Sequence, residues 1–225
     1  MVGPPGAGKS LAALRLPSIL PPLASEEALE VARIASACGR LGPGFAGGRP
    51  FRAPHHTISP PGLVGGGRPP RPGEATLAHR GVLFLDELCE FRRDTLEALR
   101  APLEDGRVTI SRAGGSRRLP CRFTLIAASN PCPCGRGEAD PQCSCPPQAI
   151  RRHEARLGAA LGDRLDIFVA IRRPSAVEIG GPPGEPSAAV RERVVAARER
   201  QEARLGAGRC NAEVEWIALG LADLD

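Results

Sequence analysis

The sequence opens with a glycine-rich loop of a kind that binds phosphate. Its residues fit the pattern Gly-x-x-x-x-Gly-Lys-Ser, in which backbone N–H groups surround the α and β phosphates of a nucleotide. The lysine of such a loop reaches the β and γ phosphates, and the serine hydroxyl binds Mg²⁺. The candidate nucleotide-binding residues are Gly3, Pro4, Pro5, Gly6, Ala7, Gly8, Lys9 and Ser10. Lys9 is the only lysine in a chain rich in arginine, which indicates that this position needs an ammonium group.

Two adjacent carboxylates follow the clearest strand that the sequence predicts. Residues 81–87 read Gly-Val-Leu-Phe-Leu-Asp-Glu, and a continuous apolar run of this kind is typical of a strand buried on both faces. Asp86 is expected to bind Mg²⁺ through water, and Glu87 to polarise the water that attacks the γ-phosphate. Together with Lys9, these acids would supply one half of a site for phosphoryl transfer. An ordinary pair of acids at a strand end is the alternative.

An asparagine follows a second buried strand, predicted over residues 123–128. Asn130 stands at the tip of that strand, where it could lie beside the γ-phosphate and orient the attacking water. A structural asparagine in a turn is the alternative. The candidate catalytic residues from this reasoning are Glu87 and Asn130, with Asp86 and Ser10 as the candidate Mg²⁺ ligands.

Four cysteines lie close together after Asn130. Cys132, Cys134, Cys143 and Cys145 have the pattern C-x-C, eight residues, C-x-C. Four thiolates from one loop could hold Zn²⁺ in a tetrahedral site. The spacing within each pair is tighter than the usual two-residue gap between zinc ligands, so unligated thiols in a reducing compartment are the alternative.

Composition limits the class of protein. With 225 residues, of which 42% are hydrophobic and 3% aromatic, the chain is long enough for one α/β domain and a small appendage. The net charge of +5 is too small to indicate nucleic-acid binding by itself. We find no apolar run long enough to span a membrane and no signal peptide. We therefore expect no membrane partner and a cytoplasmic location, where the eight cysteines would be reduced or bound to metal.

The order of the predicted elements indicates an α/β fold. Pro17 is expected to end the first helix. Residues 41–73, rich in glycine and proline, are expected to form a long insertion. His55 and His56 are expected to pack within this loop, and a contact with metal or DNA is the alternative. Alternating strands and helices predict a parallel sheet with its ligand at the carboxyl ends of the strands. The expected helices cover about 9–16, 25–38, 92–104, 148–161 and 187–206, and the expected strands cover 81–87, 107–112, 117–122, 123–128 and 165–171.

A phosphate loop, an Asp-Glu strand, a hairpin and an Asn-tipped strand, in that order, resemble an AAA+ ATPase. Three longer stretches, 49–59, 72–88 and 130–135, are similar to the magnesium-chelatase-like ComM/YifB proteins. The resemblance covers about residues 3–171. It implies a P-loop AAA+ three-layer αβα parallel sheet with a pre-sensor β-hairpin over 107–122. It also implies a core over residues 1–174 and the start of a small helical lid over 175–225.

The resemblance also implies a function. It assigns ATP and Mg²⁺ as cofactors and a hexameric ring of identical subunits in which ATP is cleaved between neighbours. It implies a DNA motor, a branch-migration helicase that acts during natural transformation. In this family, residues at the positions of Lys9, Ser10, Asp86, Glu87 and Asn130 bind nucleotide, metal and water.

Arg164 matches the position from which this clade presents an arginine finger to the neighbouring subunit, and a planar cation suits the spreading charge of phosphoryl transfer. Its alternative is a salt bridge to Asp163 or Asp166. The hairpin arginines could follow a phosphate backbone through the pore of the ring, although a plain solvated hairpin is the competing interpretation. These arginines are Arg107, Arg112, Arg117 and Arg118.

The sequence departs from the family pattern at both ends. Only Met1 and Val2 precede the loop, where family members have a complete central strand, so we expect a poorly anchored loop and weak ATP binding. The family's closing helical segment, with its nucleotide-sensing arginine, has no match before Asp225. One alternative function is that of a metal-chelatase ATPase subunit that acts on a protein partner. The departures at the ends suggest the other, an inactive fragment that serves as a binding module.

Overall fold

The computed structural model describes residues 1–42, 48–67, 70–112, 115–206, 208–209 and 211. It forms two compact units, Met1–Pro17 with Pro22–Pro182, and Ser18–Pro21 with Pro183–Asp225. Among the described residues, no helix combines the length and the apolar character needed to cross a membrane.

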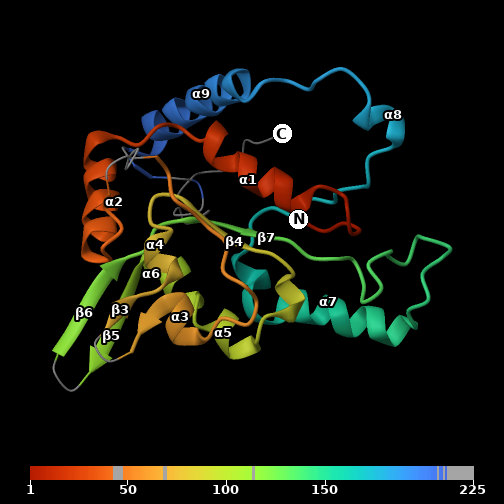
Figure 1. The fold of residues 1–225 in the computed structure, drawn as a ribbon, viewed down its shortest axis with the longest axis horizontal. Coiled ribbons are helices and arrows are strands. Elements are labelled where there is room, and N and C mark those ends of the chain that lie inside the picture. The colour runs from red at the N-terminus through yellow and green to blue at the C-terminus, as the bar shows by residue number, and fades with distance from the viewer. Residues whose placement is uncertain (43–47, 68–69, 113–114, 207, 210, 212–225) are drawn as a thin grey trace. The chain divides into compact units, whose positions relative to one another are not determined.

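The elements follow one another in mixed α/β order (Figure 1). The helices are α1 (Lys9–Ile19), α2 (Ser25–Ala37), α3 (Pro60–Val64), α4 (Glu74–Leu77), α5 (Arg93–Glu97), α6 (Arg100–Asp105), α7 (Pro147–Leu161), α8 (Ala176–Ile179) and α9 (Ser187–Leu205), with 3₁₀ turns η1 (Leu88–Glu90) and η2 (Gly162–Arg164). The strands are β1 (Phe51–Arg52), β2 (Gly65–Gly66), β3 (Arg71–Pro72), β4 (Val82–Leu85), β5 (Arg107–Arg112), β6 (Gly115–Pro120) and β7 (Thr124–Ala127).

A parallel sheet forms the centre of the first unit. Its strands have the order β1-β4-β7, and β4 pairs with β7 over four residues, from Val82 opposite Thr124 to Leu85 opposite Ala127. Val2 extends the same order by parallel bridges to Ser129 on one side and Ala170 on the other. Figure 1 shows β4 and β7 side by side.

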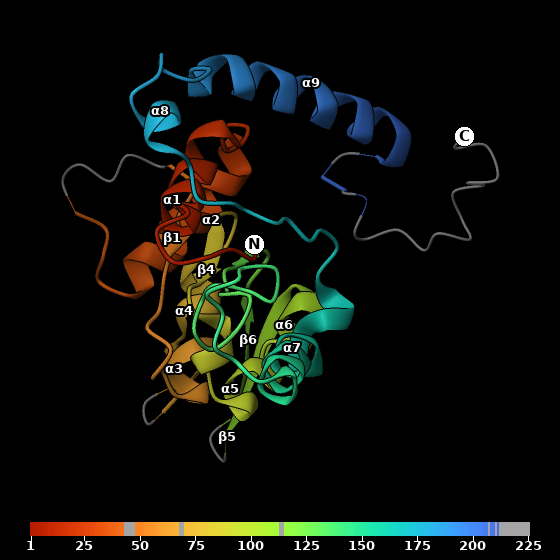
Figure 2. The same ribbon diagram turned by 90° about the vertical axis from the view of Figure 1, so that its right-hand side faces the viewer.

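Apolar side chains cover both faces of this sheet. Leu83 and Leu85 of β4 pack in a large cluster that includes Leu99 and Leu161, whereas Phe84 points to the opposite face and packs with Ala13 of α1. This alternation follows from the two-residue period of a strand. In Figure 2 the sheet lies between α1 and the pair α6 and α7. The predicted α/β fold, a parallel sheet flanked by helices, is confirmed.

The predicted hairpin over 107–122 is present as β5 and β6. The two strands pair antiparallel, from Arg107 opposite Pro120 to Arg112 opposite Gly115. Val108 and Ile110 of β5 are buried in the large cluster, which fixes the hairpin to the first unit. The predicted glycine turn falls partly on residues 113–114, which lie outside the described residues.

The predicted strand over 165–171 is wrong. Within it only Ala170 forms a bridge, to Val2, and the side chains of Ile167 and Phe168 are 78% and 67% exposed. The Val2 N–H donates to the carbonyl of Val169 at 2.8 Å, and the Ile171 N–H donates to the carbonyl of Val2 at 2.8 Å. A strand needs a neighbour to pair with at every second residue. Here Val2 alone provides one.

Two predicted helix boundaries are also wrong, and proline explains both. The single helix expected over 92–104 is divided into α5 and α6, because Pro102 has no N–H to donate to the carbonyl of Ala98 and the Leu99 N–H bonds to Leu96 in a tighter turn. By contrast, α1 continues past Pro17 to Ile19. A proline near a helix end removes one hydrogen bond without stopping the last turn.

The second unit contains α9. Arg191 on this helix donates from Nε to the carbonyl of Ser18 at 2.8 Å, which joins the short segment 18–21 to the helix. The predicted lid over 175–225 includes residues 207, 210 and 212–225, which lie outside the described residues.

His79 is a buried neutral histidine that connects α2 to the segment before β7. Its ring is 2% exposed, Nδ1 accepts from the Arg122 N–H at 3.0 Å, and Nε2 lies 3.1 Å from a carboxylate oxygen of Glu30. Burial lowers the pKa of His79, against the opposing effect of Glu30. Because Nδ1 accepts, the single ring proton is on Nε2 and donates to Glu30.

Acidification is therefore expected to destabilise the fold through His79. A second ring proton on Nδ1 would face the Arg122 N–H, so the folded state favours the neutral ring. The contribution of neutral His79 to the free energy of unfolding is therefore complete above the ordinary histidine pKa of about 6.5 and is lost as pH falls below it. Urea unfolding at about pH 7.5 and about pH 5.5 measures this loss. His79→Gln should reduce the difference between the two pH values, whereas His55→Gln, at an exposed ring, should preserve it. An undiminished difference in His79→Gln would contradict the assignment.

Candidate nucleotide-binding site

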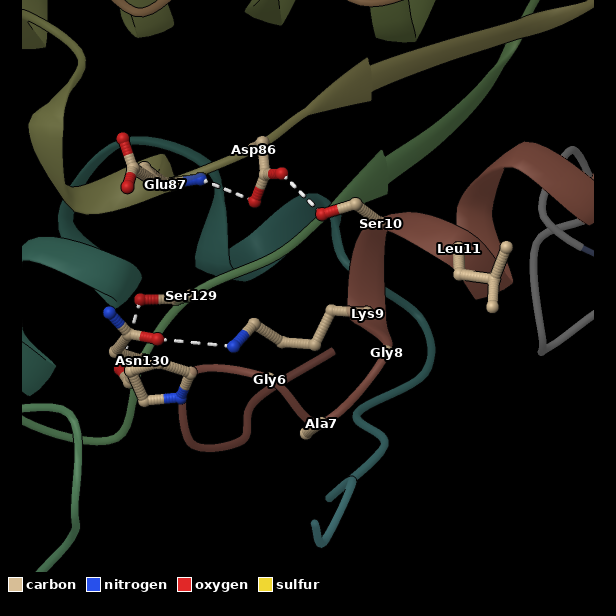
Figure 3. Close-up of a pocket in the computed structure, with 11 residues that line it drawn as sticks. Gly6, Ala7, Gly8, Lys9, Ser10, Leu11, Asp86, Glu87, Ser129 and Asn130 are labelled. Carbon is tan, nitrogen blue, oxygen red and sulfur yellow. Dashed lines mark hydrogen bonds between the residues drawn. The ribbon is translucent and has the colours of Figure 1, made fainter. Parts of the chain in front are cut away.

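A pocket of about 400 Å³ lies at the carboxyl edge of the sheet. It is formed by the glycine-rich loop, the start of α1 and the residues that follow β4 and β7 (Figure 3). Ligands of α/β sheets bind at this edge. The residues that line it are Pro5, Gly6, Ala7, Gly8, Lys9, Ser10, Leu11, Asp86, Glu87, Ser129 and Asn130.

The loop turns through two glycines with left-handed backbone. Gly6 and Gly8 have φ of 76° and 86°, a conformation that side-chain-bearing residues rarely adopt. A Cβ on Gly8 would meet no atom within 4 Å, so it is the backbone conformation and not space that requires glycine there. The Ala12 N–H then donates to the carbonyl of Gly8 at 2.9 Å and begins α1. Loop and helix start together form a site suited to an anion.

Lys9 is folded over the loop that carries it. Its side chain is buried, and its Nζ donates to the carbonyls of Gly3 at 2.6 Å and Pro4 at 3.1 Å, and to Oδ1 of Asn130 at 3.1 Å. Burial lowers the pKa of Lys9, while the nearby carboxylates of Asp86 and Glu87 oppose that shift. The structure therefore brings Lys9 and Asn130 together, as Figure 3 shows.

Ser10 and the acid pair meet on the other side of the pocket. The Ser10 hydroxyl donates to Oδ2 of Asp86 at 2.6 Å, and Oδ1 of the same carboxylate accepts from the Glu87 N–H at 3.0 Å (Figure 3). A hydroxyl and a carboxylate so close offer the hard oxygen ligands that Mg²⁺ prefers. Glu87 has φ of 52°, a left-handed conformation uncommon outside glycine.

Glu87 has a partner that the sequence reasoning did not anticipate. Nδ1 of His56 lies 3.4 Å from a carboxylate oxygen of Glu87. The His56 ring also stacks on His55, with centroids 4.0 Å apart, and meets Phe91 edge-on. The expectation that the histidine pair only packs within its loop missed the contact with Glu87. No local pattern in residues 41–73 relates this loop to the end of β4.

Asn130 is held from behind by a small buried polar network. Its backbone carbonyl accepts from Nε2 of His153 at 2.9 Å and from the Ser129 hydroxyl at 3.0 Å. The thiol of Cys89 lies 3.3 Å from that hydroxyl, and burial raises the pKa of Cys89, which keeps the thiol protonated. This network joins η1, the end of β7 and α7. Sequence reasoning identified Asn130 but not Ser129 or His153, because neither belongs to a motif.

Arg173 supports the glycine-rich loop from a distant part of the chain. Its guanidinium donates from Nη2 to the carbonyl of Pro5 at 2.7 Å. The residues are 168 positions apart, so no sequence spacing could have indicated the contact.

Arg164 does not line the pocket of its own chain. It lies in η2, where it forms an ion pair with Glu104 and lies 3.7 Å from a carboxylate oxygen of Asp163. The salt bridge to Asp163 was one of the expected alternatives, whereas Glu104 was not anticipated. The arginine-finger assignment stays a prediction.

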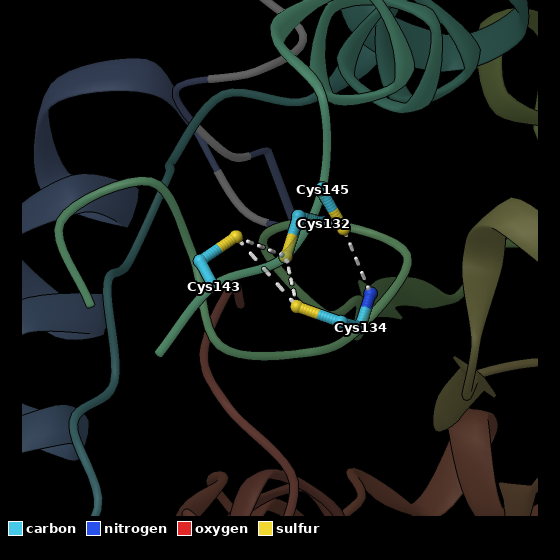
Figure 4. A group of neighbouring side chains, drawn as sticks. All are labelled: Cys132, Cys134, Cys143 and Cys145. Atoms are coloured by element: carbon cyan, nitrogen blue, oxygen red, sulfur yellow. Dashed lines mark hydrogen bonds between the residues drawn. The ribbon is translucent and has the colours of Figure 1, made fainter. Parts of the chain in front are cut away.

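The four cysteines come together outside the pocket (Figure 4). Their Sγ atoms all lie within 4.8 Å of one another. The Sγ of Cys132 is 3.3 Å from that of Cys134 and 3.9 Å from that of Cys143, and the latter two are 3.6 Å apart. The Sγ of Cys145 accepts from the Cys134 N–H at 3.4 Å. All four are free thiols.

Comparison with known proteins identifies the family. The family model described as magnesium chelatase, subunit ChlI, matches residues 1–179. The chain belongs to this family. Its fold is that of the AAA+ P-loop proteins, with the magnesium-chelatase-like ComM and YifB proteins as relatives.

Two magnesium-chelatase-like relatives are similar along most of the chain. YifB of Escherichia coli is 46% identical over 204 residues, which cover 89% of this chain and 40% of the relative. Competence protein ComM of Haemophilus influenzae is 46% identical over 214 residues, which cover 94% of this chain and 42% of the relative. The chain thus spans about two fifths of the length of these relatives. A crystal structure of NtrX from Brucella abortus in complex with ATP matches with a TM-score of 0.42 and 21% identity, over 79% of this chain and 33% of NtrX.

The network behind Asn130 leads to a prediction for His153. His153→Phe preserves an aromatic ring but removes one donor to the Asn130 carbonyl, so the free energy of unfolding should fall by about 1–3 kcal/mol. Glu154→Gln, on the exposed side of the same helix, is the matched control and should leave stability unchanged. Urea unfolding provides both values, and equal stability of the two variants would show that the hydrogen bond contributes nothing.

Proposed function

We propose that this protein binds ATP with Mg²⁺ and hydrolyses it, as the motor core of an AAA+ ATPase of the magnesium-chelatase-like ComM group. The observation that carries the proposal is the convergence of Lys9, Ser10, Asp86, Glu87 and Asn130 on one pocket. Phosphoryl transfer needs positioning and charge neutralisation more than covalent chemistry, and these side chains supply both.

Each side chain has a distinct part in the proposed reaction. The Lys9 ammonium, already aimed into the loop, neutralises charge on the β and γ phosphates. Ser10 and Asp86 would hold Mg²⁺, which would supply neutralisation of the charge that develops on the phosphates. The Glu87 carboxylate polarises the attacking water, and the Asn130 amide orients it.

The proposed enzyme works as a homo-oligomer, in our view a hexameric ring. Lys9 is the only cation among the described residues that line the pocket. Spreading phosphoryl charge is commonly balanced by a second cation, which many enzymes receive from a neighbouring molecule. Arg164 is the candidate: it is exposed and pairs with Glu104 and Asp163 in its own chain, and in the ring it would enter a neighbour's pocket.

DNA is the proposed substrate of the motor, with branch migration during natural transformation as its task. Arg107 and Arg118 are exposed on one face of the β5-β6 hairpin, and Val108 and Ile110 anchor the other face in the core. Arg117, opposite Ile110 on that second face, is exposed as well. Such a projecting basic hairpin suits a phosphate backbone. The name of the Haemophilus influenzae relative, competence protein ComM, supports a role in transformation.

We also propose Zn²⁺ as a third cofactor, held by Cys132, Cys134, Cys143 and Cys145. Zinc with four thiolates at about 2.3 Å has sulfur atoms about 3.8 Å apart, the edge of the tetrahedron. The Sγ–Sγ distances among Cys132, Cys134 and Cys143, 3.3, 3.6 and 3.9 Å, are close to this value.

A metal-chelatase ATPase subunit that acts on a protein partner is the second candidate. The match to the ChlI family model favours it. Branched DNA discriminates between the two: stimulation of ATP turnover that is lost in Arg117→Ala/Arg118→Ala supports the DNA motor. Turnover indifferent to DNA would favour the chelatase-type function.

Two substitutions should separate binding from hydrolysis. Lys9→Ala should lower affinity by a factor of about 10–100, the value of a hydrogen bond to a charged group. Glu87→Gln should leave affinity nearly unchanged and reduce turnover by about 10²–10⁴.

A fluorescent ATP analogue measures the affinity, and phosphate release measures turnover. Glu90→Gln, an exposed acid three residues further along, is the control and should behave as wild type. Wild-type affinity in Lys9→Ala would contradict the nucleotide site, and undiminished turnover in Glu87→Gln would remove this residue from the mechanism.

Mixing inactive variants tests Arg164. Arg164→Ala retains its own pocket but provides no finger, whereas Lys9→Ala has a damaged pocket but an intact Arg164. Mixed oligomers should therefore recover phosphate release that neither variant shows alone. Arg156→Ala, at an exposed arginine of α7, is the control and should release phosphate without being mixed with a second variant. Wild-type turnover by Arg164→Ala, or a mixture as inactive as its components, would be incompatible with a shared site.

A further inference from the structure

We propose that the four-cysteine loop, when it binds zinc, stabilises the conformation of the glycine-rich loop and so acts as its brace. Zinc held outside the pocket thereby sets the affinity of the pocket for nucleotide. This inference rests on the proposed zinc and ATP sites and adds a coupling between them. The four-cysteine loop is defined here as residues 132–145.

The first step is the contact between the two loops. Gly135 lies between the two cysteine pairs and is buried, with a left-handed φ of 82°. A Cβ built on Gly135 would lie 2.7 Å from Cδ and 2.8 Å from Cγ of Pro5, and 3.9 Å from Cγ of Asn130. The backbone of the four-cysteine loop thus packs directly on the glycine-rich loop, beside Asn130. Only glycine fits this approach without displacing Pro5.

The second step is what holds Gly135 in place. Residues 132–145 contain no helix or strand. The Gly135 N–H donates to the carbonyl of Cys132 at 2.9 Å, and the Gly137 N–H approaches the Sγ of Cys132 at 3.2 Å. The Cys134 N–H approaches the Sγ of Cys145. Sulfur atoms therefore take part in many of the interactions that shape this loop, alongside backbone bonds such as that from the Asp140 N–H to the carbonyl of Gly137.

The third step is the chemistry of the metal. Four thiolates are soft ligands that select zinc over Mg²⁺, whereas Ser10 and Asp86 provide hard oxygens for Mg²⁺. The two metals are thereby sorted to different sites. A zinc with four protein ligands has no open position for substrate, so its role is structural.

The coupling follows from these three steps. With zinc bound, Cys132 and Cys134 are fixed, and Gly135 next to them is pressed against Pro5. Arg173 holds the carbonyl of the same proline from another direction. Without zinc the four thiols are joined only by weak contacts, so the glycine-rich loop loses the support that Gly135 gives to Pro5. Its N–H groups are then less ordered for phosphate.

The experiment compares the zinc-replete chain with the chain stripped by a chelator. Metal analysis of the purified chain should find about one zinc per chain. Affinity for a fluorescent ATP analogue should fall about fivefold or more on stripping and recover when zinc is added back. No bound zinc, or equal affinity of the two forms, would overturn the proposal.

Three variants separate zinc binding from the brace. Cys143→Ser/Cys145→Ser should lose zinc and affinity together, while Cys38→Ser, at a cysteine outside the cluster, should keep both. Gly135→Ala leaves all four thiols and should retain zinc but weaken nucleotide binding, because its Cβ displaces Pro5. Wild-type affinity in Gly135→Ala would overturn the contact as the route of coupling.

Hydrogen exchange distinguishes failure of this inference from failure of the proposed function. The amides of Ala7 and Ala12, which donate to the carbonyls of Pro4 and Gly8, should lose protection when zinc is removed, whether or not the chain binds ATP, while those of β4 should stay protected. Absence of ATP binding with zinc-dependent protection would contradict only the nucleotide site. Unchanged protection at Ala7 and Ala12, or equal loss at β4, would overturn the brace.

Discussion

The pairing of β4 with β7 is the constraint on which the site depends. Both strands run in the same direction, and the ladder continues past their ends, where the Ala128 N–H donates to Leu85 and the Leu88 N–H donates to Ala128. Asp86 therefore leaves one strand at the level where Asn130 follows the other. The helix that begins at Lys9 packs on the same sheet through Ala13, so Ser10 meets Asp86 while Lys9 meets Asn130. A shift of one residue in the register between β4 and β7 would turn these side chains to the opposite face of the sheet.

Support for the pocket comes from parts of the chain that carry no phosphate chemistry. Arg173 and Gly135 contact Pro5 from different segments, and His153 binds the carbonyl of Asn130 from α7. Such contacts fix the loop and the amide in one geometry before a ligand binds, which is what electrostatic preorganisation requires. The buried ammonium of Lys9 stands among carboxylates and carbonyls, which offset the cost of its burial.

The edge of the sheet beyond β7 shows what pairing contributes. Val2 bridges Ser129 and Ala170, and its N–H and carbonyl are both bonded to the segment 165–171. That segment has the composition of a strand, yet Ile167 and Phe168 are exposed and no ladder forms beyond the bridge. Apolar residues favour a strand only where a neighbour supplies donors and acceptors. The apolar composition of this segment therefore favours a strand, but the predicted strand is not formed.

The sequence by itself determined the glycine-rich loop, the buried strand ending in Asp86 and the clustering of the cysteines. In each case the chemistry lies within a few consecutive residues, and local backbone geometry fixes how they face one another. Only the tertiary structure decided the pairing of His56 with Glu87 and of His153 with Asn130, and the ion pair that Arg164 makes with Glu104. These partners are brought together by the sheet and the packing of helices on it, and no periodicity in the chain encodes a distance between residues so far apart in sequence.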